Sequence, residues 1–175
     1  SSTPNNLGTV KKLHACLFPV VYSPSFFDSL LNPAAHPEDY NKLVFYQDLP
    51  VGVVVCRLEL SDAATPKTLA EAAAATKLYI MTLGVLVPYR HQGLGSKLIH
   101  HVLTSAAATH PRPKVDSVYL HVQVGNDDAR RFWEKWGFQV KDTVADYYRK
   151  IEPRDAWLLE RTVEPQLSEG ASASA

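Results

Sequence analysis

A glycine-rich turn is the segment of this chain best suited to bind an anionic group. It runs Arg90, His91, Gln92, Gly93, Leu94, Gly95, Ser96 and lies where an apolar run typical of a strand gives way to a helical pattern. Backbone N–H groups at a helix start are unpaired and partly positive, so such a turn can hold phosphate groups. Gly93 and Gly95 would let an anion approach the backbone, and Arg90 adds a positive charge. Neither the dinucleotide fingerprint nor a Gly-Lys-Ser loop is present, which disfavours nicotinamide and ATP chemistry and leaves an ordinary strand-to-helix turn as the alternative.

The elements that would position this turn follow from the spacing of apolar residues. Helices are predicted from Pro4 to about Phe18 and from Ser23 to Asn32, then at residues 93–108, and from a cap at Asn126 to Gly137. Strands are predicted at residues 42–47 and 51–60 as an antiparallel hairpin, and at 77–87, 117–124, 138–141 and 147–151, with an apolar-rich piece at 155–163. This order predicts a mixed α/β sheet covered by helices on both faces.

The strand at residues 77–87 precedes the glycine-rich turn and is expected to carry Tyr79, Met81, Leu83 and Val85 on one face. Its Gly84 would permit a bulge or the close approach of a ligand. Residues 61–76 have too little side-chain bulk to pack, so they are expected to form a mobile insertion, with a short marginal helix as the alternative. Residues 1–163 are expected to be one domain, followed by a disordered low-complexity tail at 164–175.

Composition and charge exclude several classes of protein. The chain has 175 residues, 46% of them apolar, which suits one domain with a real core. Eighteen Lys and Arg balance eighteen Asp and Glu, so the chain has no positive field that would collect nucleic acid or anionic lipid. No apolar stretch is long enough to cross a bilayer, and the chain opens on a polar segment rather than a signal peptide. A soluble protein that binds neither nucleic acid nor membrane is therefore expected.

The cysteines and histidines do not form a metal-binding pattern. Cys16 and Cys56 lie in apolar settings without Cys-x-x-Cys spacing and are expected to be buried thiols. His100 and His101 are consecutive, so they point to different sides of any helix. No metal site is expected.

The turn also carries a resemblance to a known family. Arg90 to Gly95 matches the acetyl-CoA signature of the GNAT acetyltransferase superfamily, which is Arg or Gln, two residues, Gly, one residue, and Gly or Ala. The chain resembles that superfamily from about Thr3 to Val163. Within it, four segments resemble the N-alpha-acetyltransferase 50 branch, the NatE catalytic subunits, and they cover residues 18–22, 78–84, 119–123 and 147–153.

This resemblance implies a fold and a place for the cofactor. The fold is the GNAT acyltransferase fold, a mixed and mostly antiparallel central sheet with splayed strands and helices on both faces. Acetyl-CoA would lie where the strands at 77–87 and 117–124 splay apart, with its pyrophosphate over residues 90–96. Its acetyl carbonyl and pantetheine amides would pair around Leu83, Gly84 and Val85, where a backbone N–H would also polarise the thioester oxygen. Asn126 and Trp133 would line the pantetheine side.

The resemblance also implies catalytic and peptide-binding residues. Tyr79 and His121 would share a water that removes the proton from the substrate amine, although both could instead simply fill alternating strand positions. Two loops and one strand residue would form an apolar pocket for an initiator methionine, with tyrosine hydroxyls for the peptide backbone. The residues of this pocket are Phe18, Pro19, Val20, Tyr22, Met81, Tyr147, Tyr148 and Ile151. Each loop alone is equally consistent with ordinary packing.

The implied activity is N-terminal protein acetylation of chains that start with Met followed by an apolar residue. The alternatives are a lysine or small-amine acetyltransferase, and a weakly active acetyl-CoA-binding subunit of an N-terminal acetyltransferase complex. The resemblance further implies a large auxiliary subunit and a sister catalytic subunit in a ribosome-associated complex, a location in the cytoplasm, and the nucleus as a further compartment.

Two departures from the family pattern bear on these expectations. Trp133 stands where many acetyltransferases have a tyrosine, and an indole N–H cannot protonate a leaving thiolate. The family's fold opens with a strand before its first helix, whereas this sequence begins at about that helix, so the strand is expected either to be absent or to lie outside this sequence.

Overall fold

The computed structural model describes residues 6–108 and 114–164, and its centre is a six-stranded sheet in the order β1-β2-β3-β4-β6-β5. The strands are β1 (Lys42–Tyr46), β2 (Leu49–Glu59), β3 (Lys77–Val85), β4 (Ser117–Gln123), β5 (Gln139–Val144) and β6 (Ala156–Thr162). Neighbouring strands run antiparallel, except that β3 and β4 are parallel. The predicted mixed, mostly antiparallel sheet is confirmed.

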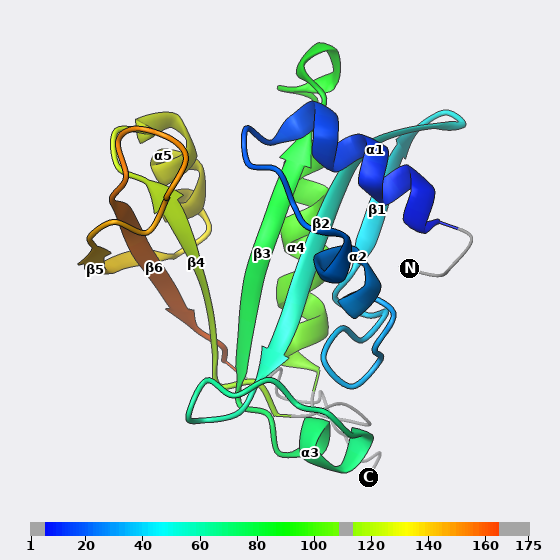
Figure 1. Ribbon diagram of the computed structural model, residues 1–175, viewed down its shortest axis with the longest axis vertical. Helices are drawn as coiled ribbons and strands as arrows, with labels where there is room; N and C mark the ends of the chain where they lie inside the picture. The colour runs from blue at the N-terminus through cyan, green and yellow to red at the C-terminus, as the bar shows by residue number, and fades with distance from the viewer. Residues whose placement is uncertain (1–5, 109–113, 165–175) are drawn as a thin grey trace, which may run out of the picture.

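Helices cover both faces of this sheet, as predicted. Figure 1 shows α1 (Leu7–Leu17) and α2 (Pro24–Ser29) in front of β2 and β3, and α4 (Leu94–Ala107) behind them. The front helices and the sheet share a core of Val10, Leu13, Phe27, Leu30, Val53 and Val55. The second core, behind the sheet, includes Leu98, Ile99 and Val102 of α4 and Trp133 of α5 (Asp127–Lys135). None of the helices in the described residues is long and apolar enough to span a membrane.

The two halves of the sheet meet only at one end. β3 and β4 pair at Lys77 with Ser117, Leu78 with Val118 and Tyr79 with Tyr119, and at no later position of either strand. Beyond Tyr79 the strands diverge, which is visible as the widening gap between them in Figure 1. The splay predicted between these strands is therefore present, and it begins directly after Tyr79.

A β-bulge in β3 changes which residues share a face. β2 pairs Val55 with Thr82 but Cys56 with Ile80, so Met81 is an extra residue on β3. The extra residue reverses the in-and-out alternation of the strand. Met81 therefore packs with the front core, while Leu83 and Val85 pack with the rear core. The predicted single face for Tyr79, Met81, Leu83 and Val85 is wrong for this reason, and the bulge lies at Met81 rather than at Gly84.

Two helices, α2 and α5, start at the predicted capping residues. The Ser23 side chain accepts a hydrogen bond from the N–H of Phe26, and Asn126 does the same for Ala129. The short helix α3 (Leu69–Ala73) is capped by Thr68, so the helical alternative for part of residues 61–76 is correct. The 3-10 turn η1 (Val87–Tyr89) leads from β3 toward α4.

Other predictions need correction or lie outside the described residues. Residues 147–151 form no strand: they are loop between β5 and β6, and β5 covers Gln139–Val144 rather than 138–141. Cys56 is buried as predicted, but Cys16 is exposed because it lies off the apolar stripe of α1. α1 begins at Leu7 after Asn6, and the predicted start at Pro4 lies outside the described residues, as does the tail from residue 165.

Candidate active site

Two adjoining cavities lie at the splay between β3 and β4. The larger, of about 480 Å³, is bounded by the segment after α1 and by the loop between β5 and β6. The smaller, of about 220 Å³, lies between β3, β4 and α5. Both cavities are lined by Val20, Tyr22, Met81, His121, Tyr148 and Ile151. A molecule bound in one cavity would therefore contact the walls of the other.

All eight residues predicted for the peptide pocket line these cavities. Tyr147 lines the larger cavity, Phe18 and Pro19 line the smaller one, and the other five belong to both. Sequence reasoning missed Val21, Phe26, Arg149 and Lys150, which also line the larger cavity. Val21, Arg149 and Lys150 lie between predicted residues in sequence, so adjacency was the signal that pointed to them, whereas Phe26 belongs to α2 and had no such signal.

Tyr79, His121 and Tyr147 form one contact cluster at the larger cavity. The Tyr79 hydroxyl lies 2.7 Å from the Tyr147 hydroxyl and 3.3 Å from Nδ1 of His121. The Tyr147 ring stacks on the His121 imidazole with centroids 4.2 Å apart. The predicted pair from the two splayed strands is thus in direct hydrogen-bond distance, and a residue predicted to bind peptide is its immediate neighbour. This arrangement can pass a proton between an imidazole and two phenols.

Burial sets the protonation state of this cluster. It lowers the pKa of His121, an effect that Glu59 partly opposes, so the imidazole is neutral at neutral pH and able to accept a proton. Burial also raises the pKa of Tyr79, so its hydroxyl stays protonated. The same effect raises the pKa of Tyr22 to about 12 and that of Tyr148 to about 12, with a smaller contribution from Tyr147 in each case. The cluster therefore contains a neutral base beside the protonated phenol of Tyr79.

A buried histidine supports the segment after α1. His14 is 1% exposed, with Nδ1 2.9 Å from the carbonyl oxygen of Val10 and Nε2 3.0 Å from Oγ1 of Thr82. Because a carbonyl only accepts, Nδ1 donates to it and Nε2 accepts from the threonine hydroxyl. Burial lowers the pKa of His14, consistent with this neutral form. The rings of Phe18 and Tyr22 each lie 5.2 Å from His14, so it joins α1, β3 and two cavity residues.

Backbone and side-chain hydrogen bonds fix the loop between β5 and β6. The N–H of Tyr148 donates to the Arg154 carbonyl at 2.8 Å, and Gln123 of β4 donates to the Pro153 carbonyl at 2.8 Å. The Tyr147 and Tyr148 rings are perpendicular to each other, with centroids 4.9 Å apart. Specific contacts thus hold the two tyrosines, although the segment is not a strand.

The glycine-rich turn has the backbone freedom that its predicted role requires. Gly93 has a φ of +77°, in the left-handed region, and no atom lies within 4 Å of a Cβ added there. The N–H groups of the first turn of α4, at Leu94, Gly95 and Ser96, precede the first helical hydrogen bond, which Lys97 donates to Gly93. Residues 91–93 are exposed. An anion can thus reach unpaired N–H groups at this helix start.

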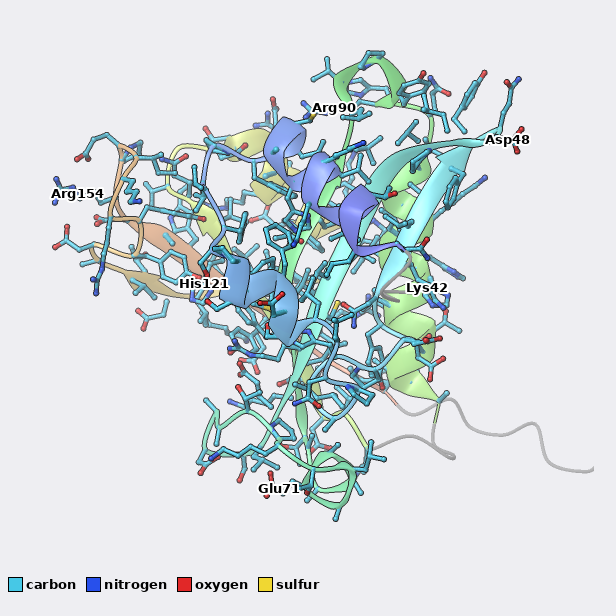
Figure 2. All side chains as sticks on the ribbon, turned by 45° about the vertical axis from the view of Figure 1, so that its right-hand side comes forward. Lys42, Asp48, Glu71, Arg90, His121 and Arg154 are labelled. Carbon is cyan, nitrogen blue, oxygen red and sulfur yellow. The ribbon has the colours of Figure 1, made fainter. Side chains whose placement is uncertain are left out.

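Not every predicted cofactor residue lies at the cavities. Leu83, Asn126 and Trp133 line the smaller one, whereas Gly84, Val85 and residues 90–96 line neither. Arg90 donates from Nε to the Val85 carbonyl at 2.8 Å, so part of its guanidinium ties the turn to the end of β3. Figure 2 shows Arg90 at the upper end of the molecule and His121 nearer its middle. This separation suits a long ligand whose charged end and reactive end bind at different places.

Gly84 and Trp133 shape the smaller cavity by packing. A Cβ on Gly84 would lie 3.0 Å from the Phe18 ring, so the absent side chain lets Phe18 lie over β3. Trp133 is 6% exposed and meets Phe132 and Phe138 edge to face.

In the described residues, no group of three or more His, Cys, Asp and Glu side chains is placed to hold a metal ion.

The fold and site agree with a known family. The sequence profile of the acetyltransferase (GNAT) family matches residues 7–138, from the start of α1 to the residue before β5. That range contains both splayed strands, the glycine-rich turn, Tyr79 and His121. The chain belongs to the GNAT acetyltransferase family.

Within that family the chain is similar to N-alpha-acetyltransferase 50. It is 36% identical over 161 residues to N-alpha-acetyltransferase 50 of Danio rerio, which covers 92% of this chain and 85% of the relative. It is 37% identical to the probable N-acetyltransferase san of Drosophila melanogaster, over 92% of this chain and 78% of the relative. Among solved structures, Arabidopsis thaliana Naa50 in complex with the bisubstrate analogue CoA-Ac-MVNAL has a TM-score of 0.75 and 38% identity, covering 91% of this chain and 93% of that one. The similarity thus extends over nearly the whole chain.

Proposed function

We propose that this protein is an acetyl-CoA-dependent N-terminal acetyltransferase that acetylates the α-amino group of proteins starting with Met followed by an apolar residue. The observation that carries the proposal is the pair of adjoining cavities that share His121 and Met81. A neutral base stands at the wall where the two substrates would meet. The similarity to N-alpha-acetyltransferase 50, and to the structure of Arabidopsis thaliana Naa50 in complex with a CoA-peptide bisubstrate analogue, supports the same function.

The substrate amine has to lose a proton before it can react. An α-amino group has a pKa near 8 and is mostly protonated at pH 7. His121 is neutral there because burial lowers its pKa, so it takes up the amine proton directly or through a water. Tyr79, within 3.3 Å of Nδ1, keeps the imidazole oriented and stays protonated itself. Tyr79 and His121 are therefore the proposed catalytic residues.

The larger cavity suits the first residues of a peptide. Val20, Met81 and Ile151 offer apolar surface to an initiator methionine side chain. The hydroxyls of Tyr22 and Tyr148 keep their protons, since the pKa of each is raised to about 12, and they can donate hydrogen bonds to peptide carbonyls. Burial of a methionine side chain contributes roughly 1.5–3 kcal/mol.

The residues present fit acetyl-CoA. The unpaired N–H groups at Gly95 and Ser96 would hold its phosphates, and Leu83, Asn126 and Trp133 would line its pantetheine arm. When bound, acetyl-CoA supplies the activated acetyl group. Trp133 carries no acidic proton for a leaving thiolate, so its role is packing along the pantetheine arm.

The partners and location of the protein form a further part of the proposal. The sequence resemblance supports a large auxiliary subunit and a sister catalytic subunit of a ribosome-associated complex as partners. It also supports a location in the cytoplasm, and in the nucleus as well. Co-purification of the tagged chain and fractionation of cells that express it test these two points.

A comparison of three peptides tests the proposed substrate. At fixed acetyl-CoA, a peptide starting Met-Leu should react about 10–150-fold faster than one starting Ser-Glu, which is the factor equivalent to methionine burial. A blocked peptide with an internal lysine should react as slowly as the Ser-Glu peptide. Val20→Lys places a charge in the pocket and should abolish the Met-Leu preference. If the lysine peptide reacted as fast as the Met-Leu peptide, the substrate assignment would be refuted in favour of a lysine acetyltransferase. A Met-Leu preference that survives Val20→Lys would also refute the assignment of the pocket.

A further inference from the structure

A buried ion-pair network lies next to the proposed catalytic pair and has no part in the mechanism above. Glu59, at the end of β2, is 1% exposed. Its Oε1 accepts hydrogen bonds from Nη2 and Nε of Arg57, at 2.5 and 3.1 Å. Its Oε2 accepts a hydrogen bond from the Tyr119 hydroxyl at 2.5 Å. A carboxylate this deeply buried needs such partners, and the phenol of Tyr119 is one of them.

This network reaches Tyr79 through two ring contacts. The Tyr119 and Tyr79 rings stack with centroids 4.8 Å apart and an interplanar angle of 18°. The guanidinium carbon of Arg57 lies 5.4 Å from the centre of the Tyr79 ring. Tyr79 and Tyr119 are also the last pair of residues joined between β3 and β4 before the strands diverge. Tyr79 is therefore the last paired residue of β3, and its partner on β4, Tyr119, is the residue that is hydrogen-bonded to Glu59.

We propose that Glu59 and Tyr119 are positioning residues for acetyl transfer: Glu59 anchors Tyr119, the Tyr119 ring supports Tyr79, and the Glu59 carboxylate stabilises the imidazolium that His121 becomes when it takes up the amine proton. The inference rests on the proposed general-base role of His121. It assigns a function to a buried acid that touches neither cavity.

The Glu59 carboxylate favours the protonated form of His121. Burial lowers the pKa of His121 and Glu59 raises it, so the carboxylate makes the base stronger than burial alone would leave it. The polar and charged groups around His121 come from several elements. They are Arg57 and Glu59 of β2, Tyr79 of β3, Tyr119 of β4, Tyr22 after α1, and Tyr147, Tyr148, Arg149 and Lys150 of the loop between β5 and β6. Of these, only Glu59 has a negative charge.

The substitution Glu59→Gln separates positioning from a merely structural role. The amide has nearly the same shape but no charge, so kcat should fall about tenfold to about a hundredfold while the KM values for peptide and acetyl-CoA change less than twofold. The acid limb of the kcat profile, and the pH at which the His121 imidazole titrates by NMR, should both move to lower pH. Glu160→Gln removes the same charge from β6, opposite Tyr119, and should leave the profile in place. A kcat profile of Glu59→Gln that matches the wild type in height and position would overturn the proposal.

Two further variants decide the matter if Glu59→Gln does not fold. Glu59→Asp keeps the charge and shortens the reach to Tyr119, so kcat should fall while the acid limb stays where it is. Tyr119→Phe keeps the stacked ring and removes the hydrogen bond to Glu59, and kcat should fall about three- to tenfold with unchanged KM. Wild-type kcat in both variants, with thermal unfolding showing folded protein, would overturn the positioning role. A wild-type enzyme inactive on every amine peptide would instead refute the proposed function itself.

Discussion

The hydrogen bond between His14 and Thr82 offers a quantitative test of how the peptide pocket is held. The two side chains are buried, 1% and 4% exposed, and their atoms are 3.0 Å apart. His14→Leu removes the acceptor and leaves a buried hydroxyl without a partner, which costs about 1–3 kcal/mol. Thr82→Val removes the donor and leaves the imidazole nitrogen unpaired, at a similar cost. Replacing both partners removes the unmatched group, so the double variant should be about 1–3 kcal/mol more stable than the sum of the single changes implies.

Urea unfolding of the four proteins at pH 7.5 measures this coupling. The same proteins should also show a functional effect, because Phe18 and Tyr22 pack on the His14 ring and line the cavities. The peptide KM should rise in His14→Leu, and the KM for acetyl-CoA should change less. Strictly additive free energies of unfolding would refute the hydrogen bond as the link between α1 and β3, and an unchanged peptide KM would refute its role in the pocket.

Three further outcomes are expected. Gly95→Glu should weaken acetyl-CoA binding at least about tenfold by calorimetry and Gly95→Gln much less, since an added Cβ meets only the Phe132 ring, at 3.7 Å; equal losses would contradict an electrostatic site. The free energy of unfolding should fall as pH drops below about 6.5, by at most about 1.4 kcal/mol per pH unit for each histidine concerned. Burial lowers the pKa of His14, His36 and His121, so the unfolded chain binds more protons than the folded chain in this pH range. His36→Gln should flatten that slope, and an unchanged slope would speak against it. Gly52→Ala should lower stability by about 1–3 kcal/mol in urea unfolding, since its Cβ would lie 2.8 Å from the Gly84 carbonyl oxygen, while Gly8→Ala, with open space around it, should not.

The sequence predicted the elements well where local signals were strong. Ser23 and Asn126 cap helices as expected, and the strands at β2, β3 and β4 lie within a few residues of the predicted ranges. The predicted strand at residues 147–151 is wrong because these residues form a loop, in which the Tyr147 ring packs on His121 and no strand pairing occurs. The bulge at Met81 has no local sequence signal, since it depends on how β2 pairs with β3.

Residues of the candidate site could be predicted where they lie in segments that resemble the family. Tyr79 and His121 came from a resemblance, and the structure places them together. Glu59 and His14 were not found, because their partners lie 60 and 68 residues away along the chain and only the fold joins them. Tyr119 did have a signal, since it stands two residues before His121 and so on the same face of β4.

Because the junction between β3 and β4 is short, a small rotation of one half of the sheet about this junction displaces the far ends of the strands. Only three residue pairs join its halves, and β3 continues six residues past the last of them, from Tyr79 to Val85. At about 3.3 Å per residue this arm is roughly 20 Å long, so a rotation of about 3° at the junction moves the far end by about 1 Å. Small changes in packing around Tyr119 are therefore magnified at the open end, where the strand leads toward the glycine-rich turn. A substitution at the junction would change the fit of a ligand that it never touches.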